Sequence, residues 1–329
     1  MRWLRIVAVA IILLAVLTWW LSSRTVDIRS DGFVLIPFTT SVAAAVDSVN
    51  AHCQLPTPWI VKNAARIIAR VSGRTVQAGW YKFDSTDSQL EVLRALFTGD
   101  SRPTMRITIP EGSTYRTIAS IIRRDLQVDS TAFVRWCETD SVCKHYGVPD
   151  SSMEGYLKPD TYDFFWRNDE ARIGDRLARA FSTMWRNRCE GRLGGTGYTR
   201  HEIITLASIV QAETGVNSEM PRIAGVYMNR LSRGMRLEAD PTVQYGLGIK
   251  RRLMYRDLDK PHAYNTYVHT GLPPGPINCP GLEALLAALE PETHNYLFFV
   301  ARGNESGLHN FAITGAEHAL NVKRYRATR

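Results

Sequence analysis

Glu213 is the residue whose position in the sequence best suits acid–base chemistry. It lies near the end of segment 199–215, which is predicted to form a helix. Three apolar residues precede it at steps of three and four and so share its face: Ile203, Leu206 and Val210. A carboxyl group that ends an apolar stripe is partly desolvated, and the carbonyl groups of a last helical turn also disfavour its charge. Glu213 is therefore a candidate general acid.

The same pattern has a simpler interpretation, in which Glu213 marks the point where the stripe leaves the core and enters solvent. Both interpretations require the helix, and its ends are signalled by the residues around it. Thr199 followed three residues later by Glu202 predicts a capping box, and Gly215 predicts a left-handed stop. The spacing by itself leaves both interpretations of Glu213 open.

The composition is that of a globular protein and points to no cofactor. The 329 residues are 45% apolar and 22% charged, and the net charge of +8 is spread along the chain, so nucleic acid is not suggested. The positive excess suits phospholipid head groups or an acidic polymer, and a solvated surface explains it equally. No Cys-x-x-Cys pair, phosphate loop or dinucleotide fingerprint occurs, so neither a metal nor a cofactor is predicted. Cys137 and Cys143 are close enough in sequence to pair in an oxidising compartment.

A membrane segment is predicted at the N-terminus. Residues 3–23 approach the roughly 20 residues that a bilayer requires, and tryptophans lie at both borders of the run. A cleavable signal peptide is the alternative, but Trp19 and Trp20 occupy the place of a small-x-small cleavage site, which favours an uncleaved anchor. Arg2 and Arg5 precede the span, so the positive-inside rule predicts a cytoplasmic N-terminus, with everything after residue 24 outside the inner leaflet.

Two further regions are predicted after this anchor. Residues 25–105 alternate short strands with helices and predict a small α+β module that binds glycan or acts as a spacer. Its expected elements are a strand at 33–37, helices at 41–52 and 59–71, a turn and strand at 77–83, and a helix at 88–96. A domain boundary is expected just before Arg106, because the strand 106–110 there begins a new alternating pattern.

The region 106–329 carries the candidate acid and the segments that are expected to enclose it. Helices are predicted at 114–126, at 220–231 after a cap at Ser218, at 282–289 and at 316–326, with a mostly buried strand at 295–300. Loops rich in Gly and Pro are expected at 235–248, 263–267 and 271–281, and an aromatic loop at 154–166. Stiff loops beside a lone acid are a common way to build a cleft.

Several of these segments, taken together, resemble the YceG-like family of endolytic murein transglycosylases. The resemblance is carried in order by the segments Pro110-Glu-Gly112, Glu154-Gly-Tyr-Leu-Lys-Pro-Asp-Thr-Tyr162, Ala207-Ser-Ile-Val-Gln-Ala-Glu-Thr214, Val226-Tyr-Met-Asn-Arg-Leu231, Gly234-Met-Arg-Leu237, Asp240-Pro-Thr-Val-Gln-Tyr-Gly246, Ala263-Tyr-Asn-Thr-Tyr267 and Pro280-Gly281. It extends over the chain from the membrane span to the C-terminus and is most specific in the last third. A weaker likeness to lysozyme-like lytic transglycosylases rests on the Glu-Thr pair and the Ala-Tyr-Asn run.

The resemblance implies an α+β fold with three parts: an N-terminal transmembrane helix (1–24), a small LysM-like α+β module (25–105), and a mixed α+β catalytic domain (106–329) with a lysozyme-like catalytic helix. It places the catalytic carboxyl group at Glu213. Many relatives carry a further Glu where this chain has Gln211, so that earlier position is dispensable to the chemistry. Relatives often place Asn directly before the Pro-Gly pair, whereas here Cys279 intervenes, which weakens a role for Asn278.

The implied reaction needs a single carboxyl group and no cofactor. Glu213 would protonate the oxygen between N-acetylmuramic acid and N-acetylglucosamine, and would then take the proton of the muramic C6 hydroxyl as it closes on C1 to give a 1,6-anhydro sugar. Asn265 and Tyr267 are expected to bond to or stack on the sugar. Glu154, Asp240 and Tyr245 complete the expected substrate contacts, and the first two are the candidates for a second carboxylate, which ordinary glycosidases use.

Three hypotheses follow for the function. The first is a single-pass inner-membrane lytic transglycosylase whose catalytic domain is periplasmic, acting on peptidoglycan strands and ending their elongation. Its expected partners are the glycan strand, the membrane lipid and, by the resemblance, peptidoglycan synthases, with no nucleic acid. The second is a two-carboxylate hydrolase of the same substrate. The third is a non-enzymatic glycan-binding or divisome protein in which Glu213 is only structural.

Overall fold

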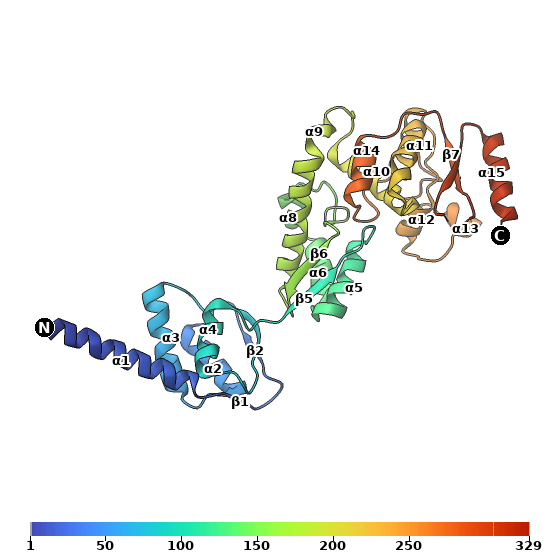
Figure 1. The fold of residues 1–329 in the computed structure, drawn as a ribbon. Helices are drawn as coiled ribbons and strands as arrows, with labels where there is room; N and C mark the ends of the chain where they lie inside the picture. Colours follow the sequence, from blue (N-terminus) through green and yellow to red (C-terminus); the bar gives the residue numbers. More distant parts are fainter. Residues whose placement is uncertain (1, 305, 329) are drawn as a thin grey trace. The chain divides into compact units, whose positions relative to one another are not determined.

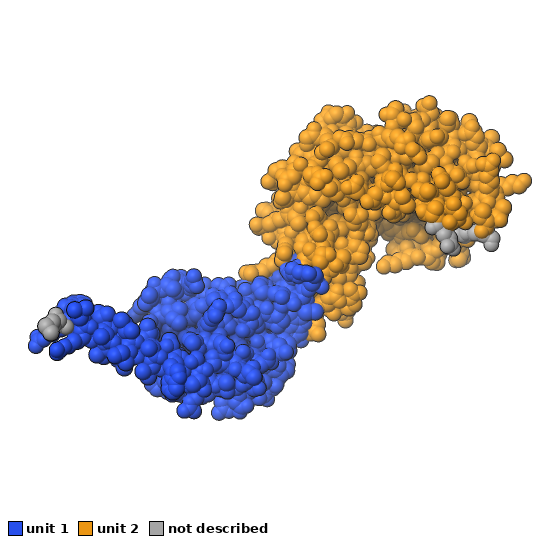
Figure 2. All heavy atoms as spheres, in the orientation of Figure 1, with its two compact units in different colours: residues 1–106, 163–168 blue, residues 107–162, 169–329 orange. Residues whose placement is uncertain are grey.

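The structure is a computed structural model that describes residues 2–304 and 306–328. The chain divides into two compact units, which are coloured separately in Figure 2. The first unit comprises residues 1–106 with 163–168, and the second comprises residues 107–162 with 169–329. The excursion of residues 163–168 from the second unit to the first is not indicated by any sequence pattern.

The first unit begins with the predicted apolar helix, α1 (Arg2–Ser22). Of its described residues only Leu21 is buried, at its C-terminal end, where Leu17 and Trp20 also pack against the core of the unit. The remaining apolar side chains are exposed, as expected of a helix whose surface meets lipid rather than protein. Within the described part of the chain, α1 is the one helix long and apolar enough to cross a bilayer.

The rest of the first unit is a small mixture of helices and antiparallel strand pairs, β1 with β3 and β2 with β4. Its elements are β1 (Asp27–Ile28), β2 (Phe33–Ile36), α2 (Val42–His52), β3 (Cys53–Gln54), α3 (Pro58–Ser72), β4 (Gly79–Lys82) and α4 (Gln89–Thr98). The three helices match the predicted ones to within two residues. Trp166 of the returning segment contacts the rings of Phe33 and Trp80, with centroids 4.6 and 5.9 Å away, and so fixes segment 163–168 to this unit.

The paired strands β5 (Thr104–Thr108) and β6 (Thr161–Phe165) each have residues in both units. The second unit then contains, in its first part, α5 (Tyr115–Leu126), α6 (Ser130–Cys137), α7 (Asp140–His145), α8 (Glu170–Arg188) and α9 (Glu190–Leu193). The predicted helix at 114–126 is confirmed, with Thr114 as its N-cap. The predicted loop at 154–166 is wrong in its second half, because residues 161–165 form β6 beside β5.

Next come the helix of the candidate acid and its neighbours: α10 (Arg200–Glu213), the 3₁₀ turn η1 (Asn217–Glu219), α11 (Met220–Ser232), α12 (Asp240–Leu247) and α13 (Tyr255–Leu258). Two predictions are corrected. Ser218 does not cap α11, because it lies within η1. The predicted loop at 235–248 contains α12, whose first turn holds Pro241, where the fixed φ of proline favours a helix start.

The chain ends with α14 (Leu282–Leu289), β7 (Phe298–Ala301), β8 (His309–Ala312) and α15 (Gly315–Ala327). The two predicted helices are confirmed. The predicted strand starts three residues late and is half-buried rather than mostly buried, since it belongs to a two-stranded antiparallel pair with α15 against it. Its partner β8 is missed by the sequence analysis, because its four residues show no strand-like alternation.

α10 forms the centre of the second unit. All eight residues from Ile203 to Val210 are buried, including Thr205 and Ser208, and α11 and α14 pack against the helix (Figure 1). The predicted one-sided stripe therefore underestimates its burial. All five cysteines are also buried and free, so Cys137 and Cys143 do not pair.

Candidate active site

α10 places Glu213 as its last residue. The amide of Glu202 donates to the Thr199 hydroxyl at 3.3 Å and the amide of Thr199 donates to the Glu202 carboxylate at 2.7 Å, so the predicted capping box is confirmed. The predicted stop is wrong, since Gly215 is not left-handed. The helix ends instead because Thr214 is extended, with a φ of −145°.

Glu213 faces a cavity of about 260 Å³ within the second unit. Its side chain is half-buried, and its Oε1 accepts a hydrogen bond of 2.7 Å from the hydroxyl of Tyr227, which comes from α11. Tyr227 itself is buried. Because the tyrosine proton occupies Oε1, the proton of a neutral Glu213 sits on Oε2, the oxygen that remains available to a bound molecule.

The surroundings of Glu213 favour its neutral form. Burial raises the pKa of Glu213 to about 7, the Tyr227 hydrogen bond opposes this rise, and the charge of Asp240 adds to it. Burial raises the pKa of Tyr227 well above its usual range, so this hydroxyl stays protonated and can donate at neutral pH. Glu213 thus holds or releases a proton near neutral pH, as a residue acting first as acid and then as base must.

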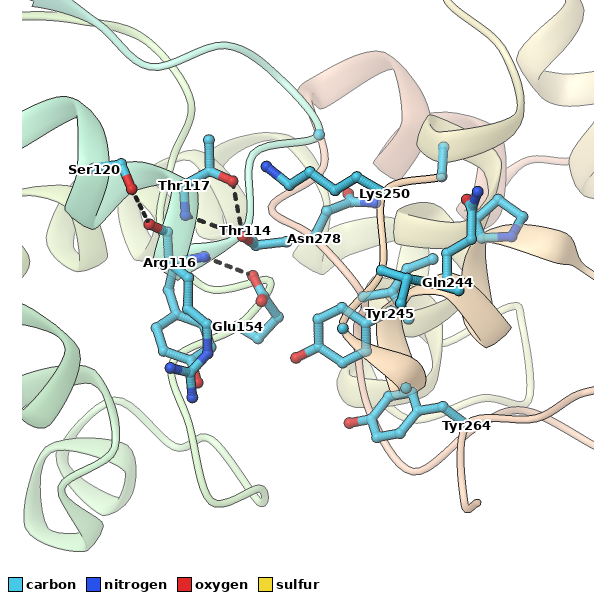
Figure 3. Close-up of a pocket in the computed structure, with 18 residues that line it drawn as sticks. Thr114, Arg116, Thr117, Ser120, Glu154, Gln244, Tyr245, Lys250, Tyr264 and Asn278 are labelled. Atoms are coloured by element: carbon cyan, nitrogen blue, oxygen red, sulfur yellow. Dashed lines mark hydrogen bonds between the residues drawn. The ribbon is translucent and has the colours of Figure 1, made fainter. Parts of the chain in front are cut away.

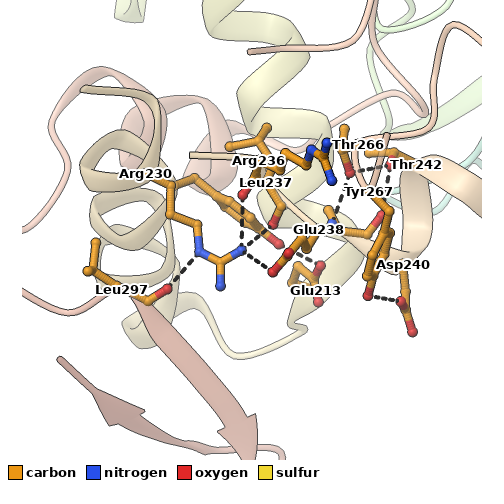
Figure 4. A network of polar contacts seen from close by, with 12 residues as sticks. Glu213, Arg230, Arg236, Leu237, Glu238, Asp240, Thr242, Thr266, Tyr267 and Leu297 are labelled. Atoms are coloured by element: carbon orange, nitrogen blue, oxygen red, sulfur yellow. Dashed lines mark hydrogen bonds and ion pairs between the residues drawn. The ribbon is translucent and has the colours of Figure 1, made fainter. Parts of the chain in front are cut away.

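Asp240 and Tyr267 line the same cavity as Glu213, and the Tyr267 hydroxyl donates to the Asp240 carboxylate at 2.7 Å (Figure 4). The two residues come from segments that Thr266 joins. Its hydroxyl accepts from the amide of Ala239 at 3.0 Å and lies 2.9 Å from the Thr242 hydroxyl at the start of α12. These hydrogen bonds join the segment of Tyr267 to the segment of Asp240 on this side of the cavity.

Arg230 of α11 holds the segment with Leu237 and Glu238 on another side of the cavity. Its guanidinium is 7% exposed and donates to the carbonyls of Leu237 and Leu297 at 2.8 and 2.7 Å, and it forms an ion pair with Glu238 at 3.1 Å (Figure 4). Most of its donors are thus occupied by the backbone. The charge of Arg230 lowers the pKa of Glu213, and its effect is smaller than those of burial, the Tyr227 hydrogen bond and the charge of Asp240.

Asn265, predicted to contact the sugar, lies elsewhere. It is completely buried, its amide donates to the carbonyls of Leu258 and Lys260 at 2.8 Å each, and its Oδ1 accepts from the amide of Tyr267 at 2.9 Å. Its polar atoms are therefore engaged with the backbone, and the residue lines neither of the cavities described here. Through the contact with its amide, Asn265 positions the backbone of Tyr267, and its contact with the sugar stays a prediction.

Glu154 and Tyr245 line a different, larger cavity of about 650 Å³ in the same unit (Figure 3). Ala212 and Pro241 also line it, and each is the direct chain neighbour of a residue of the smaller cavity, Glu213 and Asp240. The two cavities are therefore neighbours, near the C-terminal end of α10 and the N-terminal end of α12. Apart from Asn265, the predicted site residues are divided between them.

The sequence analysis missed the roles of Tyr227 and Arg230. In the predicted helix at 220–231, the apolar residues Met220, Ala224, Tyr227 and Leu231 follow one another at steps of four, three and four, so the spacing predicts a core position for Tyr227, and the ring is buried. The signal that its hydroxyl needs a partner is general: a buried Tyr hydroxyl usually finds one. No spacing rule pairs Tyr227 with a carboxylate fourteen positions earlier on another helix.

The sequence model of the YceG-like family matches residues 34–324 of this chain. The match covers most of the chain and includes all the residues of both cavities. The chain belongs to the YceG-like family. The resemblance seen in the sequence motifs is thereby confirmed, and so is the mixed α+β class.

Two curated relatives and one solved structure are similar to this YceG-like chain. The endolytic murein transglycosylase of Bacillus subtilis (strain 168) is 29% identical over 267 residues, covering 76% of this chain and 73% of the relative. That of Streptococcus pneumoniae serotype 2 (strain D39 / NCTC 7466) is 27% identical over 283 residues, covering 75% of this chain and 50% of the relative. The crystal structure of a YceG-like protein from Listeria monocytogenes superposes with a TM-score of 0.60 at 27% identity, covering 88% of this chain and 98% of that one.

The raised pKa of Glu213 predicts a pH-dependent cost to the stability of this YceG-like protein. The folded state holds the Glu213 proton more tightly than the unfolded chain, in which the pKa of this residue is near 4.5. The contribution of the bound proton to the free energy of unfolding is therefore complete below pH 4.5 and is lost as the pH rises to about 7. Glu213→Gln removes the titration. We expect Glu213→Gln to gain stability relative to the wild type as the pH rises. The free energy of unfolding of the variant minus that of the wild type should be larger at pH 8 than at pH 4.5.

Urea denaturation at the two pH values measures this difference. The matched control is Glu283→Gln, on the exposed surface of α14, which should leave the difference between the two pH values unchanged. An equal effect of Glu213→Gln at both pH values would contradict a raised pKa in the folded state.

Proposed function

We propose that this protein is an endolytic murein transglycosylase that cleaves peptidoglycan glycan strands between N-acetylmuramic acid and N-acetylglucosamine. The observation that carries the proposal is the carboxyl group of Glu213, whose pKa is raised to about 7 in a cavity where one of its oxygens is bonded to Tyr227 and the other is available. Membership of the YceG-like family and the activity named for the Bacillus and Streptococcus relatives support it.

In the first step Glu213 acts as a general acid. Its Oε2 proton is transferred to the glycosidic oxygen as the bond to C1 of the muramic residue breaks and positive charge develops on that sugar ring. The leaving N-acetylglucosamine end thereby gains its hydroxyl. The resulting carboxylate lies beside the developing charge and is stabilised by the hydrogen bond from Tyr227.

In the second step the same carboxylate acts as a base. It removes the proton of the muramic C6 hydroxyl while that oxygen bonds to C1, which closes a 1,6-anhydro ring. The acid is regenerated and no water is consumed. A pKa near 7 suits this double role, because the group must give up a proton and take one back with similar ease.

A two-carboxylate hydrolase is the second candidate, and one observation favours it: Asp240 lines the cavity of Glu213 and its charge raises the pKa of that residue. In the proposed transglycosylase, Asp240 instead orients Tyr267, whose ring and hydroxyl contact the sugar. Glu154 and Tyr245 contact a more distant part of the strand, from the larger cavity. A non-enzymatic glycan-binding or divisome protein is the remaining alternative.

We propose that the first unit anchors the enzyme and holds it close to the membrane surface. α1 holds the protein in the inner membrane as a single span with a cytoplasmic N-terminus, so both units are periplasmic. The small α+β module, which we propose is LysM-like, binds glycan or spaces the catalytic domain from the lipid, and peptidoglycan synthases are proposed partners. Burial of Leu21 in the core of the module supports a short connection between module and span.

The proposed reaction predicts that Glu213→Gln folds and binds strands but cleaves them several powers of ten more slowly. Each of the two proton transfers is typically worth about 10² to 10⁴ in rate, and the amide performs neither. Mass spectrometry of digested peptidoglycan should find 1,6-anhydro-muramic ends with the wild type, with cuts inside strands. Reducing muramic ends as the main product would support the hydrolase, and near-normal cleavage by Glu213→Gln would support the non-enzymatic alternative.

Tyr227→Phe is expected to shift the pH profile of the reaction towards higher pH. The phenol donates to the Glu213 carboxylate, so its removal raises the pKa of Glu213 further and moves the alkaline limb of kcat/KM upward, by up to about one pH unit. Rates at pH 5 to 9 measure the shift. Tyr255→Phe, on an exposed tyrosine, is the control. An unchanged or lowered limb would show that Tyr227 does not stabilise the charged form.

The anchor predicts that the full-length protein stays with membranes. α1 exposes apolar side chains along most of its length, and their burial in lipid contributes about 25 cal/mol for each Å² removed from water. We expect carbonate-washed membranes of producing cells to retain the chain with residues 1–24 attached, as read by N-terminal peptide mass spectrometry. A soluble product that begins after Leu21 would identify α1 as a cleaved signal sequence.

A further inference from the structure

The larger cavity contains two polar groups that the protein itself leaves unsatisfied. Its walls come from the start of α5, from the loop at Glu154, from α12 with the residues after it, and from Tyr264 and Asn278 (Figure 3). It lies entirely within the second unit. A volume of about 650 Å³ is within the range of small-molecule sites and is large enough for a sugar unit with its substituents.

Glu154 is the first of these groups. It is 1% exposed, and its Oε1 accepts from the amide of Tyr115 at 3.1 Å and from the thiol of Cys279 at 3.7 Å. No hydrogen bond of good geometry reaches its Oε2 from the described residues, although the Tyr245 hydroxyl lies close enough to lower the pKa of Glu154. The backbone next to Glu154 takes a conformation that favours glycine. Gly155 has a φ of +79°, and a Cβ there would lie 2.6 Å from Pro276. A buried carboxyl oxygen without a partner is costly unless a ligand supplies one.

The surroundings of Glu154 favour its neutral form at physiological pH. Burial raises its pKa to about 8, opposed by hydrogen bonding from the Tyr115 amide, the Tyr245 hydroxyl and Cys279. Burial also raises the pKa of the tyrosines and cysteines that interact electrostatically with Glu154, so they are neutral at physiological pH. These residues are Tyr115, Cys137, Tyr245, Tyr264 and Cys279. Its Oε2 is thus a hydrogen-bond donor at the cavity wall.

Asn278 is the second group. It is 4% exposed, and its Nδ2 donates to the carbonyl of Ser208 on α10 at 2.7 Å, which fixes the orientation of the amide. Its Oδ1 has no hydrogen-bond partner among the described residues. The cavity wall therefore holds one unsatisfied donor and one unsatisfied acceptor. Beside them lie the rings of Tyr245 and Tyr264, whose centroids are 4.9 Å apart.

A secondary amide matches this combination, because it offers a carbonyl to the donor and an N–H to the acceptor, and its methyl group can lie against the aromatic rings. We propose that the larger cavity is a subsite for an N-acetylated sugar of the strand, in which Glu154 donates to the acetamido carbonyl and Asn278 accepts from the acetamido N–H. This assignment rests on the proposed action on glycan strands. It makes the acetyl group, not only the sugar ring, a feature that the protein selects.

The subsite is tested by binding in the full-length Glu213→Gln background, where strands are not consumed. The probes are glycan strands freed of stem peptides, either N-acetylated or chemically de-N-acetylated. We expect the acetylated strands to bind about tenfold more tightly, which is the upper range for one hydrogen bond to a buried group. Adding Glu154→Leu should remove most of this preference, and adding Glu283→Gln on exposed α14 should not. Equal binding of the two strands before any change at Glu154 would overturn the proposal.

A pH series separates a ligand contact from a merely structural role of Glu154. Binding of acetylated strands should weaken as pH rises above about 8, because the carboxylate can no longer donate. Adding Glu154→Gln, which keeps a donor of the same shape, should make binding independent of pH over this range. Loss of thermal stability in Glu154→Leu with an unchanged acetyl preference, or the same pH dependence with Glu154→Gln, would assign Glu154 to structure alone.

These outcomes are distinct from failure of the proposed function. If Glu213→Gln still cleaved strands, the catalytic assignment would fail in the product analysis, whereas the acetyl preference would be read separately from short incubations. If the strands bound with an acetyl preference that depended on Glu154 but were cut to reducing ends, the subsite would stand and the reaction class would change. Asn278→Leu gives an independent measure, with weaker binding of the acetylated strands expected, because the acetamido N–H loses its acceptor.

Discussion

The burial of α10 on every side is the constraint on which the rest of the second unit depends. A helix enclosed in this way cannot rotate or shift without exposing apolar surface, so its last residue has a fixed direction. The neighbouring loop is attached to it directly. The Ser208 hydroxyl accepts from the amide of Ile277 at 3.0 Å, and Gln211 accepts from the amide of Gly281 at 2.9 Å. Both cavities are therefore built against one rigid element.

The pKa of Glu213 in the smaller cavity depends on its having no direct ion pair with Arg230. Arg230 is a buried cation close enough to act on the carboxyl group, yet its donors are occupied by backbone carbonyls and by Glu238. A free cation there would favour the carboxylate and remove the acid. Tyr227 supplies a weaker stabilisation of the charged form through a neutral donor. The balance leaves the proton near its point of release at neutral pH.

The position of the two cavities suits a polymer more than a single small molecule. Ala212 and Pro241 line the larger cavity, and the next residues along the chain, Glu213 and Asp240, line the smaller one. A strand that occupied both would be held near the C-terminal end of α10 and the N-terminal end of α12, with binding in the larger cavity available to orient the bond at Glu213. Such remote contacts contribute to catalysis by positioning the reacting group.

The sequence by itself determined the elements whose signals are local. The capping box of Thr199 and Glu202, the apolar spacing that ends at Glu213, and the helices at 114–126 and 282–289 are set by neighbouring residues, so they were predictable. The family was also predictable, because its motifs are contiguous. Gly215 shows the limit of such signals: a glycine permits a left-handed stop, but the helix had already ended at Thr214.

Only the tertiary structure decided which groups meet. The hydrogen bond between Tyr227 and Glu213 and the division of Asp240 and Glu154 between two cavities both depend on contacts between distant segments. Burial has the same origin, since the neutral state of Glu213 requires other helices to exclude water from its last turn. Periodicity places a residue on a face, and packing of the whole chain decides what that face meets.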